Sequence, residues 1–146
     1  WFTKMLPKEN WVAFLNKNLE IKIYLIGSEQ DRGLNDWIIS RSNNRSAESL
    51  AGHLTLLESA ALMGSAKMNY VNDSAPLHLC SAVNAPVTAL FCSTLPSFGF
   101  TPLSDNSIIL ETKEHLDCRP CGMHGKKECP KGHFKCGDFD IQIPEM

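Results

Sequence analysis

The sequence of 146 residues has little that would point to nucleic acid, to a membrane or to a charged tail. Its 14 basic residues are outnumbered by 16 acidic ones, so it lacks the basic excess typical of nucleic-acid-binding domains. It has no run of about 18 apolar residues, and we therefore expect no transmembrane helix. Its first residues have neither the charged region nor the apolar core of a signal peptide. An initial methionine is also missing, which predicts a fragment of a longer protein.

The amino-acid composition fits a globular domain with one hydrophobic core. Hydrophobic residues make up 43% of the sequence and charged residues 21%, which is ordinary for a globular protein. The sequence contains no internal repeat, no low-complexity tract and no linker that would split it. We therefore predict a single domain over residues 1–146 with a cytoplasmic location.

Strands and helices alternate along the chain. The hydrophobic periodicity predicts helices over residues 7–19, 31–40, 55–66 and 76–83. Runs of β-branched and other apolar residues predict strands over residues 21–26, 68–71, 87–91 and 108–110, with loops over 41–49 and 93–106. This alternation predicts a parallel sheet wrapped by helices, and the last residues, 143–146, indicate the start of another helix. Ligands of such sheets bind where strands end, which directs attention to the turns after Ile26, Val71 and Phe91.

The most informative segment covers residues 72–79, because it follows a predicted strand and opens a predicted helix. Pro76 suits the first turn of a helix, where its missing N–H would be unpaired anyway. Asp73 or Ser74 can cap that helix. Free backbone N–H groups and the positive end of the helix dipole would then bind an anion such as phosphate, and His78 could reach it. The spacing alone slightly favours a simpler interpretation, a capped helix with a surface histidine.

Lys4 and Asp31 are further candidates for a nucleotide site. Lys4 lies just before the first predicted helix and could supply a mobile positive charge to a phosphate. Taken alone, such a lysine is more often a solvated surface charge. Asp31 follows Gly27 and could accept a hydrogen bond from a ribose hydroxyl. Its simpler interpretation is a helix N-cap, and the two roles are compatible.

Six segments, in order along nearly the whole chain, together resemble glycosyltransferase family 9, the bacterial heptosyltransferase family of lipopolysaccharide synthesis. Residues 73–79, Asp-Ser-Ala-Pro-Leu-His-Leu, are similar to the family's Asp-Ser/Thr-Gly-Pro-x-His signature. The four cysteines between residues 118 and 136 match a pattern of many members. These two motifs are quite specific. The other similar segments are weak evidence singly, and their order along the chain supports the resemblance: Lys4–Trp11, Ile23–Asp31, Leu50–Leu62 and Pro86–Pro96.

The resemblance implies a GT-B glycosyltransferase, which has two Rossmann-like domains, each a three-layer parallel sheet with helices, and a cleft between them. The chain resembles the C-terminal domain without its first strand, and this domain binds the nucleotide-sugar donor, typically ADP-heptose. The acceptor would be a lipopolysaccharide core or a related glycan, with peripheral association at the inner membrane left open. The sugar would be transferred with inversion and without a catalytic cofactor. The general base would belong to the absent N-terminal domain, so we expect no catalytic residue here and no activity of the fragment alone.

The resemblance also assigns donor-binding roles by motif. Lys4 would contact the donor diphosphate, and Asp31 would face the ribose. The loop of Asp73, Ser74 and Ala75 would meet the diphosphate and the sugar, with His78 close by. Lys4 and the helix N-terminus would stabilise the charge that grows on the leaving group.

Three residues depart from the family pattern. Ala75 stands where the signature has glycine, Cys92 replaces the glycine after Phe91, and Leu6 replaces a tryptophan. If the two glycine positions need a positive φ or a close approach of the donor, the larger residues are unfavourable there. These departures are also compatible with three alternatives: a GT-B enzyme that uses another nucleotide sugar, an inactive member of the family, or a non-catalytic interaction module stabilised by zinc. A nucleotide-binding assay would distinguish the enzyme from the interaction module.

The six cysteines fall into two groups. Cys80 and Cys92 lie in apolar, regular stretches and indicate small core residues. The other four have the spacing C-x2-C-x7-C-x6-C within a cysteine-rich segment, residues 117–137, and could bind a structural zinc ion: Cys118, Cys121, Cys129 and Cys136. Clustered cysteines in a cytosolic domain favour metal over disulfides. Free or disulfide-paired thiols, an iron–sulfur cluster, and His124 or His133 as ligands remain alternatives.

Overall fold

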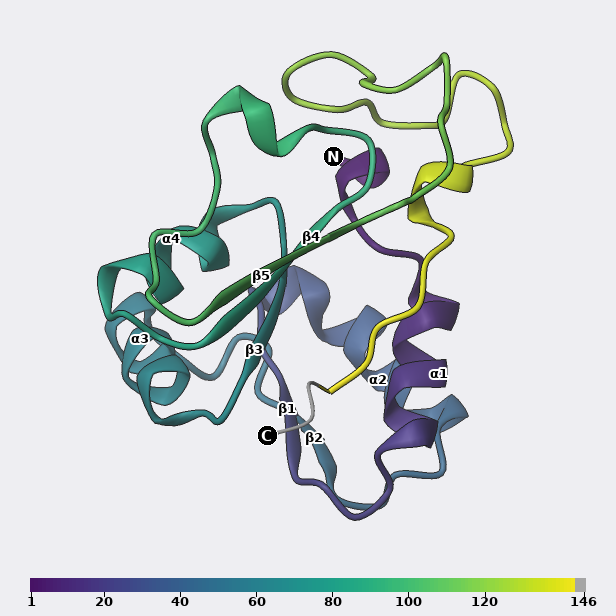
Figure 1. The fold of residues 1–146 in the computed structure, drawn as a ribbon. Helices are drawn as coiled ribbons and strands as arrows, with labels where there is room; N and C mark the ends of the chain where they lie inside the picture. The colour runs from purple at the N-terminus through teal and green to yellow at the C-terminus, as the bar shows by residue number, and fades with distance from the viewer. Residues whose placement is uncertain (144–146) are drawn as a thin grey trace. The chain divides into compact units, whose positions relative to one another are not determined.

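A computed structural model describes residues 1–143 and has a mixed α/β fold whose strands pair in parallel (Figure 1). The chain divides into two compact units. Unit 1 contains Trp1–Leu6 and Ala60–Phe139, and unit 2 contains Pro7–Ser59 and Asp140–Met146. The helix expected to start at 143–146 falls mainly on residues 144–146, which lie outside the described residues.

Unit 2 is a small parallel α/β unit. Its elements are α1 (Lys8–Lys17), β1 (Ile23–Leu25), the 3-10 turn η2 (Glu29–Asp31), α2 (Arg32–Arg41) and β2 (Ala47–Ser49). Helices α1 and α2 pack together, and the apolar side chains Phe14, Leu15 and Ile38 are buried. Their spacing follows the helical period, as expected for faces that pack inward, whereas Leu19, the last apolar residue of the helix predicted over 7–19, lies beyond α1 and is 43% exposed.

Strand β2 corrects the loop that we expected over residues 41–49. Its sequence, Ala-Glu-Ser, has none of the β-branched or aromatic residues that indicate strands. It is a strand because its backbone pairs with β1, from Ile23 opposite Ala47 to Leu25 opposite Ser49. Pairing with a neighbour decides the conformation of so short a segment, and a local sequence signal cannot report it.

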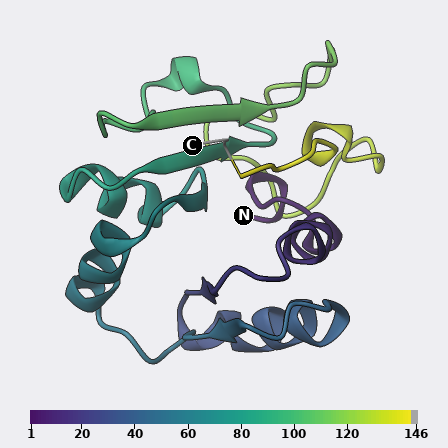
Figure 2. The ribbon, with the colours of Figure 1, turned by 60° about the horizontal axis from the view of Figure 1, so that its bottom comes forward.

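Unit 1 contains a three-stranded parallel sheet in the order β3–β4–β5. Helix α3 (Leu56–Ser65) leads into it, followed by β3 (Asn69–Asn72), α4 (Ala75–Ala82), β4 (Val87–Phe91) and β5 (Ser107–Glu111). Every residue of the central strand β4 is buried, which explains why its sequence is apolar except for Thr88. Figure 2 shows β4 and β5 side by side and pointing the same way.

The register of the sheet brings two chain turns to one edge. Asn72 at the end of β3 lies opposite Leu90 near the end of β4, and the Asp73 amide donates to the Leu90 carbonyl at 3.2 Å. The turns after β3 and β4, two of the three that the sequence singled out, therefore neighbour each other. The third, after β1, belongs to unit 2.

The long segment after β5 has little regular structure. Between residues 112 and 143 the structure contains one short 3-10 turn, η4 (Lys135–Gly137), and neither an α-helix nor a strand. This segment carries the four clustered cysteines. None of the helices between residues 1 and 143 is both long and apolar enough to cross a bilayer.

Candidate functional site

The turn between β3 and α4 holds a buried carboxylate in contact with a lysine from the start of the chain. Asp73 is 4% exposed. Its Oδ2 lies 2.9 Å from Lys4 Nζ and accepts a hydrogen bond from Thr94 Oγ1 at 2.7 Å. Thr94 follows the neighbouring strand β4. The two residues that the resemblance assigns to the same diphosphate, Lys4 and Asp73, are thus in direct contact.

Helix α4 begins in this turn without a side-chain cap. Ser74 occupies the N-cap position, but its hydroxyl donates to the Asn72 carbonyl at 3.3 Å. The Asp73 carboxylate is used by Lys4 and Thr94. Within residues 1–143, neither side chain caps the helix, so the expected cap is wrong. The positive end of this helix, at the exposed residues Ser74 and Ala75, therefore remains open to an anion.

Thr3 fixes the backbone beside Lys4. This residue is fully buried, and its amide donates to the Lys126 carbonyl at 3.1 Å. Its hydroxyl accepts the Lys126 amide at 2.7 Å and also lies 2.9 Å from Ser93 Oγ. The Ser93 amide in turn donates to the Thr3 carbonyl at 3.1 Å. Lys4 is consequently presented from a backbone held on both sides, by the turn after β4 and by the cysteine-rich segment.

Gly125 allows that segment to approach Lys4 so closely. It has a φ of +71°, which favours glycine. A Cβ added there would lie 2.8 Å from Lys4 Cγ and 2.9 Å from Thr3 Oγ1. Both the backbone conformation and the space therefore require a residue without a side chain.

Arg119 ties the cysteine-rich segment to the carboxyl end of β4. Its guanidinium donates to the carbonyls of Cys92 at 2.7 Å and Thr94 at 2.8 Å. It also donates to the Phe91 carbonyl at 3.2 Å and pairs with Glu111 at 2.5 Å. These contacts satisfy carbonyl oxygens that the sheet leaves unpaired where β4 ends.

Two other predicted site residues, His78 and Asp31, make contacts of their own. His78 lies on the exposed face of α4, where its ring meets Phe100 edge-on at 6.3 Å between centroids. Asp31 belongs to unit 2, where its carboxylate accepts the Ser28 amide and hydroxyl, each at 2.7 Å. Asp31 thus closes a capping box around η2, close to the simpler interpretation of this residue.

The departures at Ala75 and Cys92 do not strain the backbone. Among the described residues other than glycine, only Asn84 and Phe134 have a positive φ. Ala75 begins α4, and Cys92 is fully buried, which raises the pKa of its thiol to about 12. The conformational objection to alanine and cysteine is therefore removed. Cys80 is also fully buried, as expected for a core residue.

Sequence reasoning missed several residues that build this site, namely Thr3, Thr94, Arg119, Gly125 and Lys126. Thr94 carried a usable signal, since it follows a buried strand in a parallel sheet. Thr3 is the neighbour of Lys4, and the others come from a segment far away along the chain: Arg119, Gly125 and Lys126. No local pattern marks any of these residues as part of the site.

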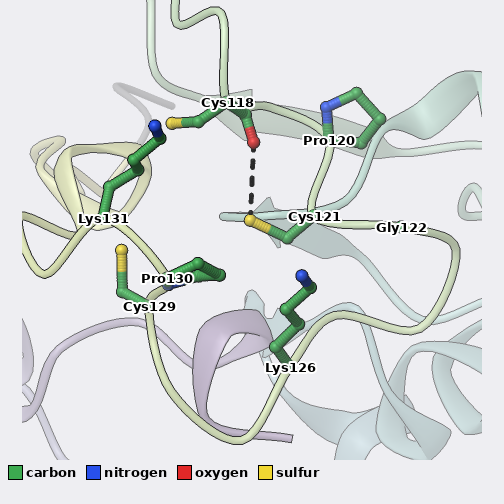
Figure 3. A pocket seen from close by; sticks show the side chains of 8 residues that line it. All are labelled: Cys118, Pro120, Cys121, Gly122, Lys126, Cys129, Pro130 and Lys131. Carbon is green, nitrogen blue, oxygen red and sulfur yellow. Dashed lines mark hydrogen bonds between the residues drawn. The ribbon is translucent and has the colours of Figure 1, made fainter.

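The cysteine-rich segment encloses a cavity of about 310 Å³ (Figure 3). Figure 3 shows three of the predicted metal ligands around it, together with two lysines: Cys118, Cys121, Cys129, Lys126 and Lys131. The fourth predicted ligand, Cys136, is buried. Among residues 1–143, no three His, Cys, Asp or Glu side chains are close enough as they stand to hold a metal ion. The metal site remains a prediction.

Comparisons with known proteins agree with the resemblance. The sequence model of "Glycosyltransferase family 9 (heptosyltransferase)" matches residues 1–132. Among solved structures, the chain is similar to ADP-heptose lps heptosyltransferase II of E. coli, with a TM-score of 0.69 and 24% identity over 82% of this chain. It is also similar to a family 9 glycosyl transferase of Veillonella parvula, with a TM-score of 0.68 and 24% identity over 75% of this chain. The chain spans 39% and 32% of these two proteins. A comparison with curated proteins gives no match.

Proposed function

The chain belongs to glycosyltransferase family 9, the heptosyltransferase family, and on that premise we propose that it binds the nucleotide-sugar donor of such an enzyme. One observation carries the proposal: Lys4 and Asp73 meet at the uncapped start of α4. A diphosphate is recognised by a cation and by backbone N–H groups at a helix N-terminus, and both occur together there.

The proposed role of Lys4 is to stabilise the leaving group. Asp73 holds the ammonium beside the helix N-terminus, and Thr94 holds Asp73. When the bond to the sugar breaks, negative charge grows on the nucleoside diphosphate. A lysine already in position and the positive end of α4 balance that charge with little reorganisation. Ser74, Ala75 and His78, on the same turn and helix, would face the diphosphate and the sugar.

The rest of the reaction is proposed from the family. The donor is ADP-heptose, the acceptor is a lipopolysaccharide core or a related glycan, and the anomeric carbon is inverted. Asp31 faces the donor ribose. The general base is supplied by sequence outside this chain, so residues 1–146 alone have no transferase activity. The whole enzyme works in the cytoplasm.

An amide-shift titration with ADP, UDP and GDP tests donor binding. Millimolar nucleotide reveals binding worth only about −4 kcal/mol. We expect selective shifts with ADP at Asp73–His78 and at Lys4. The Lys4→Gln variant should lose most of this binding, whereas Lys67→Gln, which changes an exposed lysine of the same unit, should keep it.

The outcomes separate the alternatives. Equal shifts with every nucleotide, or shifts only with UDP or GDP, would refute the ADP donor. The absence of shifts with all three would refute donor binding by this chain and favour a non-catalytic interaction module. Turnover by the chain alone would contradict the proposed location of the general base.

A further inference from the structure

The cysteine-rich segment is held in one place by features other than regular structure. Its backbone amides and carbonyls bond to Thr3 and Ser93, and Arg119 bonds to the end of β4. Loops of this kind, with few apolar side chains, are usually fixed by a cross-link such as a metal or a disulfide.

Two tight turns in the segment present cysteine sulfur atoms. In the first, Cys118 and Cys121 are followed by Gly122 with a φ of +81°. In the second, Cys129 is followed by Gly132 with a φ of +71°, whose amide donates to the Cys129 carbonyl at 3.0 Å. Glycine adopts these φ values without steric cost, so each turn can fold back sharply after its cysteine. In the first turn the Cys121 thiol donates to the Cys118 carbonyl at 3.5 Å (Figure 3).

Backbone donors surround the Cys129 sulfur atom. The N–H groups of residues 131–134 hydrogen-bond to it. Amide donors around a sulfur ligand also hold it in a fixed orientation.

Cys118 and His133 lie close together. The Lys135 amide donates to His133 Nδ1 at 3.1 Å, and His133 Nε2 is 3.8 Å from Cys118 Sγ. The Nδ1 atom is therefore already used by a backbone amide and could bind a metal ion only if that hydrogen bond broke.

Three of the four thiols line one cavity: Cys118, Cys121 and Cys129. Cys136 is buried in the same segment and lies close enough to all three for their charges to act on it. Four thiolates so placed would repel one another, and a divalent cation bound between them would remove that repulsion. Lys126 and Lys131 line the same cavity and offset part of the charge.

We propose that Cys118, Cys121, Cys129 and Cys136 bind one zinc ion as four thiolates, in a site separate from the donor site. Zinc prefers this ligand set with tetrahedral geometry, and a closed set of four ligands is structural rather than catalytic. Because no three of these side chains stand within metal-binding range, the two turns must close on the ion as it binds. Binding and ordering of the loop are then coupled.

The site is connected to the backbone of Lys4. Arg119, which lies between the first two cysteines, bonds to the end of β4, and Gly125 and Lys126 pack on Thr3. Closing the turns on zinc therefore steadies the loop that holds Thr3. We expect the Thr3 amide, which donates to the Lys126 carbonyl, to exchange with solvent at least several-fold more slowly with zinc bound.

Metal analysis of the chain, purified without chelator, tests the site directly. We expect one zinc per chain, released by a chelator and regained on adding Zn²⁺. Replacing zinc with Co²⁺ should give the absorption bands of tetrahedral thiolate ligation. Cys121→Ser and Cys129→Ser should lose most of the bound metal. Cys80→Ala, which changes a buried cysteine outside the segment, should retain it.

Other results of the same experiments would contradict the zinc site. A reduced chain that binds no zinc, or that regains it equally well without Cys121 and Cys129, would overturn the proposal. So would bound iron with inorganic sulfide, or mapped disulfides among these cysteines in protein purified under reducing conditions. None of these readouts involves a nucleotide, so their outcome is independent of the donor proposal.

Discussion

The variant Gly125→Ala tests whether the cysteine-rich segment positions Lys4 by close packing. Alanine at a φ of +71° costs about 1–2 kcal/mol, because its Cβ crowds the backbone in the left-handed region. Its Cβ would also lie 2.8 Å from Lys4 Cγ and 2.9 Å from Thr3 Oγ1. Overpacking of this kind costs about a further 1–3 kcal/mol. The free energy of unfolding should therefore fall by about 2–5 kcal/mol.

Gly132→Ala is the matched control. Gly132 has the same φ of +71°, but no described atom lies within 4 Å of the added Cβ. This variant should lose only the backbone part, about 1–2 kcal/mol. The difference between the two variants then isolates the contact with Thr3 and Lys4.

Urea denaturation, followed by tryptophan fluorescence, measures both variants. Amide exchange at Thr3 gives a local readout, since the Thr3 amide donates to Lys126 in the same contact. We expect faster exchange at Thr3 in Gly125→Ala than in Gly132→Ala. Equal losses of stability in the two variants, with unchanged Thr3 exchange, would refute the argument that Gly125 is needed for the approach to Lys4.

Two further predictions concern the buried Asp73 carboxylate and the thiols of Cys129 and Cys92. Thr94→Val removes the 2.7 Å hydrogen bond to the buried Asp73 carboxylate and should lower the free energy of unfolding by about 1.5–3 kcal/mol in urea. Thr88→Val, at a buried threonine whose hydroxyl meets only a methionine sulfur among its described contacts, should cost clearly less, and an equal cost would contradict the role of Thr94. In metal-free, reduced protein, the lowered pKa of Cys129 means that its alkylation by iodoacetamide should rise at a lower pH than for an ordinary thiol. Cys92, with a pKa of about 12, should stay unmodified at neutral pH, and mass spectrometry showing the reverse order would refute both assignments.

Much of the secondary structure could be predicted from the sequence alone. Strand β4 is apolar except for Thr88, and Pro76 stands in the first turn of α4 after a polar turn, so both elements follow from local chemistry. Strand β2 could not be predicted, since its three residues have no strand preference of their own. Only the hydrogen bonds to β1 make it a strand.

The candidate site was predicted only in part. The sequence of residues 73–79 predicted a turn that leads into a helix. The family resemblance assigned both this turn and Lys4 to the donor diphosphate. The sequence also suggested that Asp73 or Ser74 would cap α4. Instead, Lys4 and Thr94 take the Asp73 carboxylate, because a buried charge is stabilised more by a cation and a hydroxyl than by helix amides alone.

By itself, the sequence determined the alternation of strands and helices, the family and the spacing of the four cysteines. These properties depend on neighbours along the chain, or on the order of motifs. The tertiary structure alone decided that Thr3, Ser93 and Lys126 meet, and that Gly125 lies against Lys4. Those contacts join segments from opposite ends of the chain, and their register is set by sheet pairing and backbone hydrogen bonds, which carry no signature in the local sequence.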